Sequence, residues 1–401
     1  MPDVIQTIDT LDVHGKTVLV RVDFNVPRAA DGTITDDTRI RAHLPTIVDL
    51  QAKDARIVLM SHLGRPGGQR DDKESLRGIA AHLSALLGQT VDFADDCIGP
   101  DAEEMAARLN PKGVGLLENL RFHAEEEANN PEFARKLAKL GDVYLNDAFG
   151  TAHRAHASTA GIAEFVAQKG IGRLMQQEVN ALSKVFDKPK KPVLVISGGS
   201  KVSSKIDILR HLVTKADQMM IGGAMANTFL AALGHDMGNS LFELEQRANA
   251  KEILSLAGAC GCRILLPVDV TVAEGLKENM PTQVADVEHI PADSMALDIG
   301  PKTAEQWSKL ISQAGTILWN GPVGAFEIAP FDMGTTALAK AIAASQAYSL
   351  AGGGDTIAAI AKAGVEADIG YISTGGGSLL EFLEGKELPG IKAVGSSKNA
   401  A

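Results

Sequence analysis

Residues 190–206 of this 401-residue chain read KKPVLVISGGSKVSSKI and lie close to its midpoint. The run from Val193 to Ile196 is continuously apolar and rich in β-branched side chains, which is typical of a strand buried on both faces. It leads through two glycines into a predicted helix whose N-cap is Ser203 or Ser204. Helical spacing places three apolar side chains on the inner face of this helix: Ile206, Leu209 and Val213.

A strand that passes through glycines into a helix N-terminus can hold phosphate, because free N–H groups and the positive end of the helix dipole both face it. Lys201 and Lys205 would add positive charge there. The stretch lacks the Gly-Lys-Ser/Thr ending of a Walker A motif and the G-x-G-x-x-G of dinucleotide folds. By itself it leaves two interpretations open, a phosphate-binding loop or a tight turn in a buried sheet.

Length and composition predict a globular protein of two domains. A chain of 401 residues exceeds one ordinary core, and 45% hydrophobic with 22% charged residues is typical of soluble proteins. The net charge of −11 argues against general nucleic-acid binding, which needs a basic surface. Any anion site must therefore be a local cluster of basic side chains.

The three cysteines, Cys97, Cys260 and Cys262, are too few for a disulfide framework and fit a reducing compartment. Cys260 and Cys262 have no second Cys or His pair at ligand spacing, so buried thiols are favoured over a metal site. The N-terminus shows no basic-then-apolar signal, and no apolar run reaches about 18 residues. We expect a cytoplasmic protein with no membrane partner.

Strands and helices alternate regularly along the first half. Apolar runs predict strands at residues 16–22, 55–60, 114–117 and 142–146, and helices are predicted from about residue 38, over 75–87 and over 131–140. The acidic run 125–127 is most simply a solvated face. This alternation predicts a doubly wound parallel sheet.

Polar side chains follow these predicted strands, and ligands of such sheets bind beyond the carboxyl ends of the strands. The residues at these ends are Asp23, Asn25, His62, Arg65, Arg121, His153 and Arg154, and Arg39 opens the first helix. Taken singly, each is interpreted as an ordinary surface charge. Together they predict a site for a small, multiply charged anion, since arginine forks match carboxylate and phosphate geometry.

The second half repeats the alternation with different loops. Strands are predicted at residues 193–196, 218–221, 263–266, 316–319, 348–351 and 371–374, and glycine follows nearly all of them. Glycine lets the backbone approach a ligand closely. A helix is predicted over 172–187, and the prolines and charges of 188–192 after it indicate a domain boundary.

Eight motifs resemble those of the phosphoglycerate kinase family, and they occur in that family's order. They are RVDFNVP (21–27), SHLGRP (61–66), LLENLRF (116–122), GTAHRAHAS (150–158), GGSKVSSK (198–205), WNGPVG (319–324), GGGDT (352–356) and TGGGS (374–378). The resemblance covers essentially the whole chain.

The resemblance implies an α/β fold of two doubly wound, Rossmann-like parallel-sheet domains joined by a hinge helix. Residues 1–171 would bind phosphoglycerate, 172–187 would form the interdomain helix, and 188–388 would bind Mg-nucleotide. Residues 389–401 would pack back on the first domain. The family also implies a monomer.

The implied reaction is reversible phosphoryl transfer between ATP and the carboxylate of 3-phosphoglycerate, giving ADP and 1,3-bisphosphoglycerate, in glycolysis and gluconeogenesis. Domain closure would bring the two substrates together. The implied substrate-binding residues are Asp23, Asn25, Arg39, His62, Arg65, Arg121 and Arg154. The implied nucleotide-binding residues are Lys201, Lys205, Gly222, Gly223, Asn320, Pro322, Glu327, Gly353, Gly354, Asp355, Thr356 and Gly376. Asp355 would hold Mg²⁺, and Arg39 and Lys201 would act catalytically on the phosphoryl group in flight.

The residue types suit this chemistry, because phosphoryl transfer depends on positioning and charge neutralisation. A carboxylate nucleophile is already ionised, so neither His62 nor His153 is assigned as a general base. Two other classes are weighed against the kinase. A dinucleotide-dependent oxidoreductase would need glycines after the first strand, which are absent. An inactive scaffold on the same fold predicts loss of the key charged residues, which are present.

Overall fold

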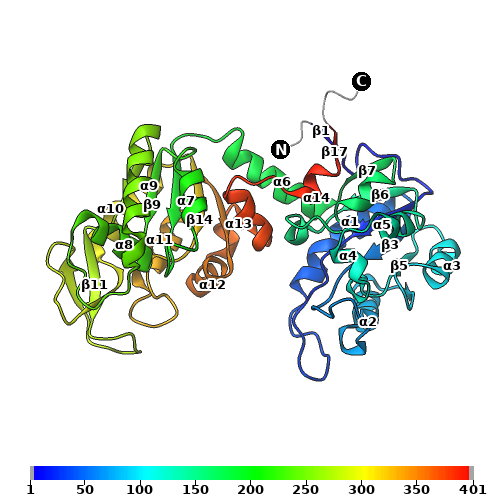
Figure 1. Ribbon diagram of the computed structural model, residues 1–401, viewed down its shortest axis with the longest axis horizontal. Coiled ribbons are helices and arrows are strands. Elements are labelled where there is room, and N and C mark those ends of the chain that lie inside the picture. The colour runs from blue at the N-terminus through cyan, green and yellow to red at the C-terminus, as the bar shows by residue number, and fades with distance from the viewer. Residues whose placement is uncertain (1–3, 397–401) are drawn as a thin grey trace. The chain divides into compact units, whose positions relative to one another are not determined.

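The computed structural model describes residues 4–396, which form two compact units (Figure 1). Unit 1 comprises the chain up to Val179 and again from Glu387, and unit 2 comprises Asn180–Lys386. Each unit contains its own six-stranded parallel sheet. The α/β fold class with two parallel sheets is thereby confirmed.

The sheet of unit 1 has the strand order β4-β5-β3-β2-β6-β7. Its strands are β2 (Thr17–Arg21), β3 (Arg56–Met60), β4 (Val91–Phe93), β5 (Val114–Leu116), β6 (Val143–Asn146) and β7 (Gln168–Ile171). Its helices are α1 (Thr38–Ala52), α2 (Arg77–Leu87), α3 (Pro100–Arg108), α4 (Ala124–Glu127) and α5 (Pro131–Ala138). Strands β3, β5 and β4 lie on one side of β2, and the later strands β6 and β7 lie on the other, which makes the boundary between β2 and β6 a topological switch point.

Local sequence explains these elements. Val18, Leu19 and Val20 of β2 are fully buried, as a central parallel strand requires. The predicted helix over 75–87 is observed as α2, and Ile79 and Leu83 face the core. Asn130 caps α5 by accepting hydrogen bonds from two backbone N–H groups of its first turn.

The sheet of unit 2 has the order β10-β9-β8-β14-β15-β16, with a second switch point between β8 and β14. Its strands are β8 (Val193–Ser197), β9 (Gln218–Ile221), β10 (Arg263–Leu265), β14 (Thr316–Asn320), β15 (Tyr348–Gly352) and β16 (Tyr371–Ser373). Its helices are α7 (Ile206–Leu212), α8 (Gly223–Leu233), α9 (Arg247–Cys260), α10 (Pro301–Gln313), α11 (Met333–Ala343), α12 (Gly354–Ala363) and α13 (Gly377–Leu383). Every residue of β8 is buried, as the opening stretch predicted.

Unit 2 also contains a three-stranded antiparallel sheet that the sequence interpretation missed. It has the order β12-β11-β13, formed by β12 (Gln283–Asp286), β11 (Asp269–Ala273) and β13 (Met295–Ile299). β12 is largely exposed, so it lacks the continuous apolar run that marked the parallel strands. Val270 and Val272 face a small separate core that includes Leu230 of α8.

The predicted cap of the helix after β8 was wrong. Helix α7 begins at Ile206, and its N-cap, Lys205, makes no side-chain capping bond. The Ser203 hydroxyl donates to Glu243, and the Ser204 hydroxyl donates to the Lys201 carbonyl oxygen. The two serines are drawn into other contacts, so the loop between β8 and α7 is longer than expected.

Helix α6 (Arg173–Phe186) lies within the predicted span 172–187. Its first residues are fixed to unit 1, since the Arg173 side chain contacts both Asp9 and Asp49 and the Met175 N–H donates to Asp147. The boundary between the two units lies within this helix, between Val179 and Asn180. None of the helices in residues 4–396 is both long enough and apolar enough to span a bilayer.

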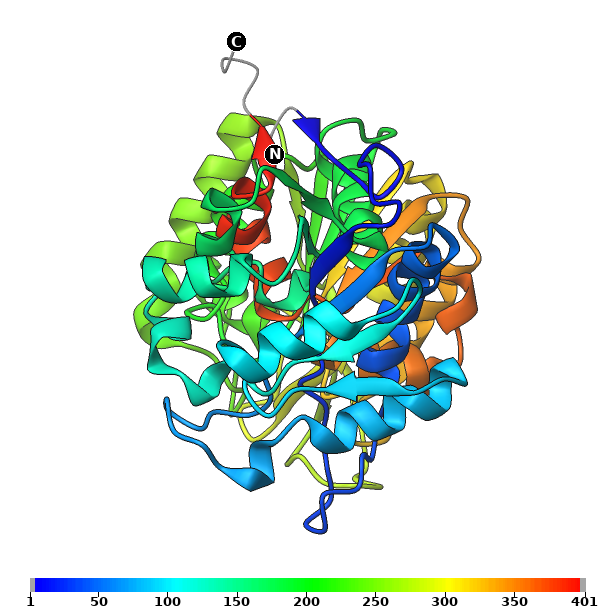
Figure 2. The ribbon, with the colours of Figure 1, turned by 90° about the vertical axis from the view of Figure 1, so that its right-hand side faces the viewer.

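The two ends of the described chain meet in unit 1. Strand β1 (Val4–Ile5) pairs antiparallel with β17 (Gly395–Ser396), side by side in Figures 1 and 2. Helix α14 (Pro389–Lys392) precedes β17, and the Gly390 N–H donates to the Ala152 carbonyl oxygen at 2.8 Å. Residues 397–401 of the predicted tail 389–401, like residues 1–3, lie outside the described residues.

Candidate active site

The loop after β2 brings three of the predicted substrate residues together. Arg39 Nη1 donates to the Asn25 carbonyl oxygen at 2.9 Å and lies 3.3 Å from Asp23 Oδ2. The Asn25 N–H donates to Asp23 Oδ1, and Asn25 Oδ1 accepts from the Gly64 N–H of the loop after β3. Arg39 is about half exposed, with 47% of its side chain accessible, so this cation reaches solvent.

Deeper at the same edge lies a cluster of basic side chains that includes His62, Arg121 and Arg154. His62 is 4% exposed, and burial lowers the pKa of its imidazole well below the usual value. The charges of Arg21, Arg121, Arg154 and His156 lower this pKa further. His62 is therefore neutral at physiological pH.

Arg21 fixes the tautomer of His62. Arg21 Nη2 lies 3.2 Å from His62 Nδ1, and a guanidinium can only donate. His62 Nδ1 must accept, so the imidazole carries its proton on Nε2. The ring thus offers a neutral N–H donor that suits a carboxylate or phosphate oxygen.

The sequence interpretation gave Arg21 no role, although it opens the RVDFNVP motif. Arg21 is 1% exposed, and its Nε donates to Ser158 Oγ at 2.8 Å. Ser158 in turn donates to Glu126 through both its N–H and its hydroxyl. The available signal was an arginine as the last residue of a strand buried on both faces.

Glu126 corrects the interpretation of residues 125–127 as a solvated face. Glu125 and Glu127 are exposed, but Glu126 is fully buried, and burial raises the pKa of its carboxyl group. The hydrogen bonds from Ser158 and the charge of Arg21 oppose that rise. Glu126 thus stabilises the buried side of the basic cluster through Ser158, which bonds to both Glu126 and Arg21.

Arg121 is held ready for an anion. Its side chain is 4% exposed, and Nη1 donates to the Gly64 carbonyl oxygen at 2.8 Å. Its Nε lies 3.1 Å from a Glu127 oxygen but in no hydrogen-bonding geometry, so this buried donor has no acceptor in residues 4–396. Arg154 Nε donates to His153 Nε2 at 3.2 Å, whereas Arg65 is exposed.

A buried relay, also missed, links the loop after β2 to the start of α6. The Asp23 N–H donates to His43 Nε2 at 3.0 Å, and His43 Nδ1 donates to Asp147 Oδ2 at 2.8 Å. Asp147 Oδ1 accepts from the Met175 N–H, and Asp147 Oδ2 also accepts from Thr46. The polar residue His43 on the buried face of α1 was the available signal.

A large cavity of unit 1 lies beside this site and is not centred on it. Its volume is about 1100 Å³, and it reaches Asn25 and Gly64 while its other walls carry Arg28, Arg70 and Lys73. Because His62, Arg121 and Arg154 do not line it, we regard the strand-end cluster, and not this cavity, as the centre of the anion site.

In unit 2 the loops after β8 and β14 converge on Lys205. Its ammonium donates to the carbonyl oxygens of Gly198 and Asn320 and to Asn320 Oδ1, at 2.8 to 3.0 Å. Burial lowers the pKa of Lys205 to about 8, and nearby Asp355 opposes that shift. Lys201, on the same loop, is exposed.

The loops around Lys205 pack too closely for side chains. A Cβ on Gly198 would lie 1.8 Å from the Pro322 carbonyl oxygen, and a Cβ on Gly222 would lie 2.4 Å from Val323. Gly223 has a φ of +66° and also abuts Gly199. The predicted glycines Gly222 and Gly223 therefore shape the loop itself.

The remaining predicted nucleotide residues lie at strand ends of the same sheet. Asn320 Nδ2 donates to the Gly352 carbonyl oxygen, and buried Thr356 Oγ1 accepts from the Gly321 N–H at 2.8 Å. Gly353 and Gly376 have positive φ and precede α12 and α13. Gly354, Asp355, Glu327 and Gly376 are exposed, and Pro322 is buried.

The residues near Lys205 fit a hard divalent cation that brings most of its own ligands. Mg²⁺ is bound in such sites by one or two carboxylates together with substrate phosphates. Asp355 provides one exposed carboxylate in the first turn of α12. Thr356 offers less, because its oxygen already accepts a backbone hydrogen bond.

Unit 1 carries basic side chains such as His62, Arg121 and Arg154 at the ends of its strands, which we call its basic rim. Together with the lysine-glycine loops of unit 2, they define a two-domain α/β phosphotransferase. The family model described as "Phosphoglycerate kinase" matches residues 8–386. The chain belongs to the phosphoglycerate kinase family, as the eight motifs predicted.

Relatives and solved structures agree with this assignment. The chain is 52% identical to the phosphoglycerate kinase of Moorella thermoacetica, covering 97% of this chain and 98% of that protein. It is 50% identical to that of Rhodospirillum centenum, with 98% and 99% covered. It superposes on the structure of phosphoglycerate kinase from Coxiella burnetii with a TM-score of 0.93 at 43% identity, covering 97% of this chain and 98% of that one.

Proposed function

We propose that this chain catalyses reversible phosphoryl transfer between ATP and the carboxylate of 3-phosphoglycerate, a step of glycolysis and gluconeogenesis. The products are ADP and 1,3-bisphosphoglycerate. Membership of the family over residues 8–386 supports this reaction. Within the site, the single observation that carries the proposal is the buried basic cluster in which Arg121 Nε has no hydrogen-bond acceptor among the described residues 4–396.

In this proposal 3-phosphoglycerate binds to unit 1. Arg65, Arg121 and Arg154 grip its phosphate, with neutral His62 donating from Nε2. Asp23 and Asn25 bind the glycerate hydroxyl and carboxylate region. Arg39, which reaches solvent, is left to face the group that is transferred.

The nucleotide binds to unit 2. Lys205 gives up its carbonyl partners and contacts the phosphates, while the free N–H groups at the start of α12 add donors. The remaining contacts come from Gly222, Gly223, Asn320, Pro322, Glu327, Gly353, Gly354, Thr356 and Gly376. Asp355 holds Mg²⁺, which when bound neutralises phosphate charge. Lys201 faces the phosphoryl group together with Arg39.

No proton needs to move before attack, because a carboxylate is ionised at neutral pH. The protein's contribution is to position the substrates and to neutralise charge on the transferred group. The substrate sites lie in separate units, with 1–171 holding phosphoglycerate and 188–388 holding nucleotide. Closure about the helix 172–187 assembles the site and excludes water.

We further propose a cytoplasmic monomer that binds neither nucleic acid nor membrane. The net charge of −11 supports the first exclusion, since phosphate backbones need a basic partner surface. Sedimentation at several protein concentrations tests the monomer: a mass that rises with concentration would contradict it.

The test of function is formation of 1,3-bisphosphoglycerate, coupled to NADH oxidation, for the wild type, Arg39→Ala and Lys201→Ala. We expect the wild type to turn over and both variants to lose activity by about 100-fold or more. A wild type that binds both ligands but does not turn over would support the scaffold reading. Variants with wild-type rates would remove Arg39 and Lys201 from the mechanism.

A further inference from the structure

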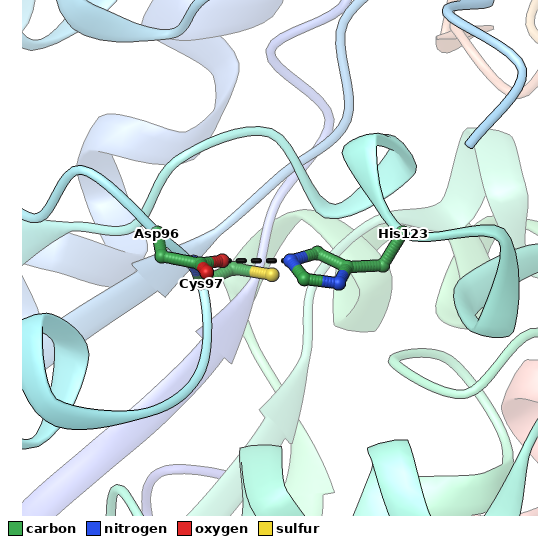
Figure 3. A group of neighbouring side chains, drawn as sticks. All are labelled: Asp96, Cys97 and His123. Carbon is green, nitrogen blue, oxygen red and sulfur yellow. Dashed lines mark hydrogen bonds and ion pairs between the residues drawn. The ribbon is translucent and has the colours of Figure 1, made fainter. Parts of the chain in front are cut away.

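A carboxylate, a thiol and an imidazole meet in unit 1, outside the set of residues proposed to bind substrate. Asp96 and Cys97 lie in the loop between β4 and α3, and His123 directly follows the short 3-10 helix Leu120–Phe122. One ligand atom from each residue lies within 4.8 Å of the other two. In Figure 3 the Cys97 sulfur lies beside the hydrogen bond that joins Asp96 and His123.

The cluster is held in place but open on one side. Asp96 Oδ1 accepts from His123 Nε2 at 2.7 Å and from the Cys97 N–H at 2.6 Å. The His123 ring is tilted against Phe133, with centroids 5.2 Å apart. The side chains of His123 and Asp96 are 27% and 45% exposed, whereas Cys97 is fully buried. The Cys97 sulfur is therefore the buried member of the cluster, and the other two side chains are accessible to solvent.

We propose that Asp96, Cys97 and His123 form a binding site for a borderline-soft divalent cation such as Zn²⁺. Sulfur, imidazole nitrogen and carboxylate oxygen are the three donor types that Zn²⁺ takes from proteins, and Mg²⁺ avoids the first two. Zinc bonds of about 2.0 to 2.3 Å put tetrahedral ligand atoms roughly 3.5 Å apart. The three ligand atoms already lie within 4.8 Å of one another and would move to that spacing on binding, with solvent as the fourth ligand.

Proton balance for the binding step is simple. Burial raises the pKa of the Cys97 thiol, so Cys97 starts as S–H. Formation of the metal–sulfur bond sends that proton to solvent. His123 Nε2 exchanges its proton for the metal while Nδ1 takes one up, so a neutral ring stays neutral and one proton is released overall. No oxidant or reductant takes part.

A metal ion bound to this cluster would affect the proposed phosphoglycerate site. His123 lies two residues after Arg121 and directly before α4, which carries Glu126 and Glu127. Glu126 binds Ser158, and Glu127 approaches Arg121. A bound ion would therefore tie the β4–α3 loop to the segment that positions Arg121, and we expect it to raise the thermal stability of unit 1.

Co²⁺ is the probe of choice because a cobalt–thiolate bond gives a near-ultraviolet charge-transfer band that carboxylate sites such as Asp355 do not produce. Titration of the metal-free full chain should give this band with one ion per chain, and Zn²⁺ should abolish it. Cys97→Ser should lose the band. His123→Gln, at a part-exposed position, should weaken binding by about tenfold or more. Cys260→Ser removes the exposed thiol and is the matched control, which should behave as wild type.

Circular dichroism and kinase activity, measured with Mg²⁺ but without Co²⁺ or Zn²⁺, establish that each variant is folded. A wild type without the band, a band that survives Cys97→Ser, or a band lost in Cys260→Ser would each overturn the proposal. If Cys97→Ser does not fold, His123→Gln decides: wild-type affinity in that variant excludes the site.

Discussion

The two proposed anion sites are built from different chemical groups. Unit 1 uses side chains: Arg21, His62 and Arg121 are almost fully buried and are fixed to one another or to backbone carbonyl oxygens. Unit 2 uses backbone: Gly222, Gly353 and Gly376 are the N-cap residues of its helices α8, α12 and α13, and none of them has a side chain that could cap the helix.

The difference teaches how rigidity is distributed. In the proposed function, a small anion with fixed charges is matched by cations that are already desolvated in the folded protein. A long, flexible nucleotide is matched by helix N-termini and by a metal that arrives with it. Because both tryptophans, Trp307 and Trp319, lie in unit 2, indole fluorescence reports that unit alone, and each unit can be tested separately.

The largest expected effect comes from Arg21→Met. This change removes the donor to His62 Nδ1 and takes the positive charge of Arg21 away from buried Glu126. We therefore expect the free energy of unfolding to fall by about 3 kcal/mol. We also expect kcat/KM for 3-phosphoglycerate to fall by about 100-fold. Circular dichroism should show that unit 1 unfolds at a lower temperature than in the wild type. The unfolding temperature reported by tryptophan fluorescence, which follows unit 2, should not change.

Arg65→Met is the matched control, since Arg65 is an exposed arginine of the same rim. It should change stability by less than about 0.5 kcal/mol while still weakening substrate binding. Equal destabilisation by the two changes would break the contrast between buried and exposed cations.

Gly198→Ala should act on unit 2 alone. The added methyl would overlap the Pro322 carbonyl oxygen, so the loops after β8 and β14 must separate. We expect KM for MgATP to rise by about tenfold, from overpacking of about 1 to 3 kcal/mol, with KM for 3-phosphoglycerate unchanged. Gly275→Ala, where a methyl meets nothing within 4 Å, should leave both constants at wild-type values.

Lys205 predicts a pH dependence for the nucleotide. Its pKa of about 8 in the free protein means that the ammonium loses its proton, and its attraction for phosphate, as the pH rises through that value. Thus kcat/KM for MgATP should fall above about pH 8. At saturating ATP the bound phosphates hold the proton, so kcat/KM for 3-phosphoglycerate should not show this step. A decline that persists in Lys205→Arg, which does not titrate, would assign it to another group.

The smallest effect is expected at helix α5 of unit 1, which Asn130 caps. Asn130→Ala removes the side-chain cap of α5 in unit 1 and should cost about 1 kcal/mol, with kinetic constants unchanged. Thermal unfolding by circular dichroism measures it. A matching shift in tryptophan fluorescence would mean that the units do not unfold independently.

Sequence patterns predicted both parallel sheets because a strand buried on both faces, such as β8, must be continuously apolar. They did not reveal β12, whose exposed face leaves no such run, or the short edge strand β7, which begins with two polar residues. The opening stretch favoured Ser203 or Ser204 as a cap, but the Ser203 hydroxyl bonds to distant Glu243 and the Ser204 hydroxyl bonds to the nearby Lys201 carbonyl oxygen.

For the site, motif positions predicted residues that the structure places at the strand ends, and their roles there stay a prediction. They did not identify Arg21, Glu126, His43 or Asp147, which support the rim from within. Buried charges are rare in proteins. The apolar strand that ends at Arg21 and the acidic run around Glu126 therefore did not indicate that these two charged side chains are buried. Only the fold reveals that Ser158 and Glu126 are there to meet Arg21.

The pairing of β1 with β17 has a consequence for biosynthesis. A ribosome releases residues in order, so all of unit 2, Asn180–Lys386, emerges before the strand that closes unit 1. Nascent unit 1 must wait, with β1 unpaired and the Ala152 carbonyl oxygen without the Gly390 N–H, until residues 390–396 have been synthesised. The part of the chain made first is thus the part completed last, and truncation near residue 387 should damage unit 1 at the far end of the sequence.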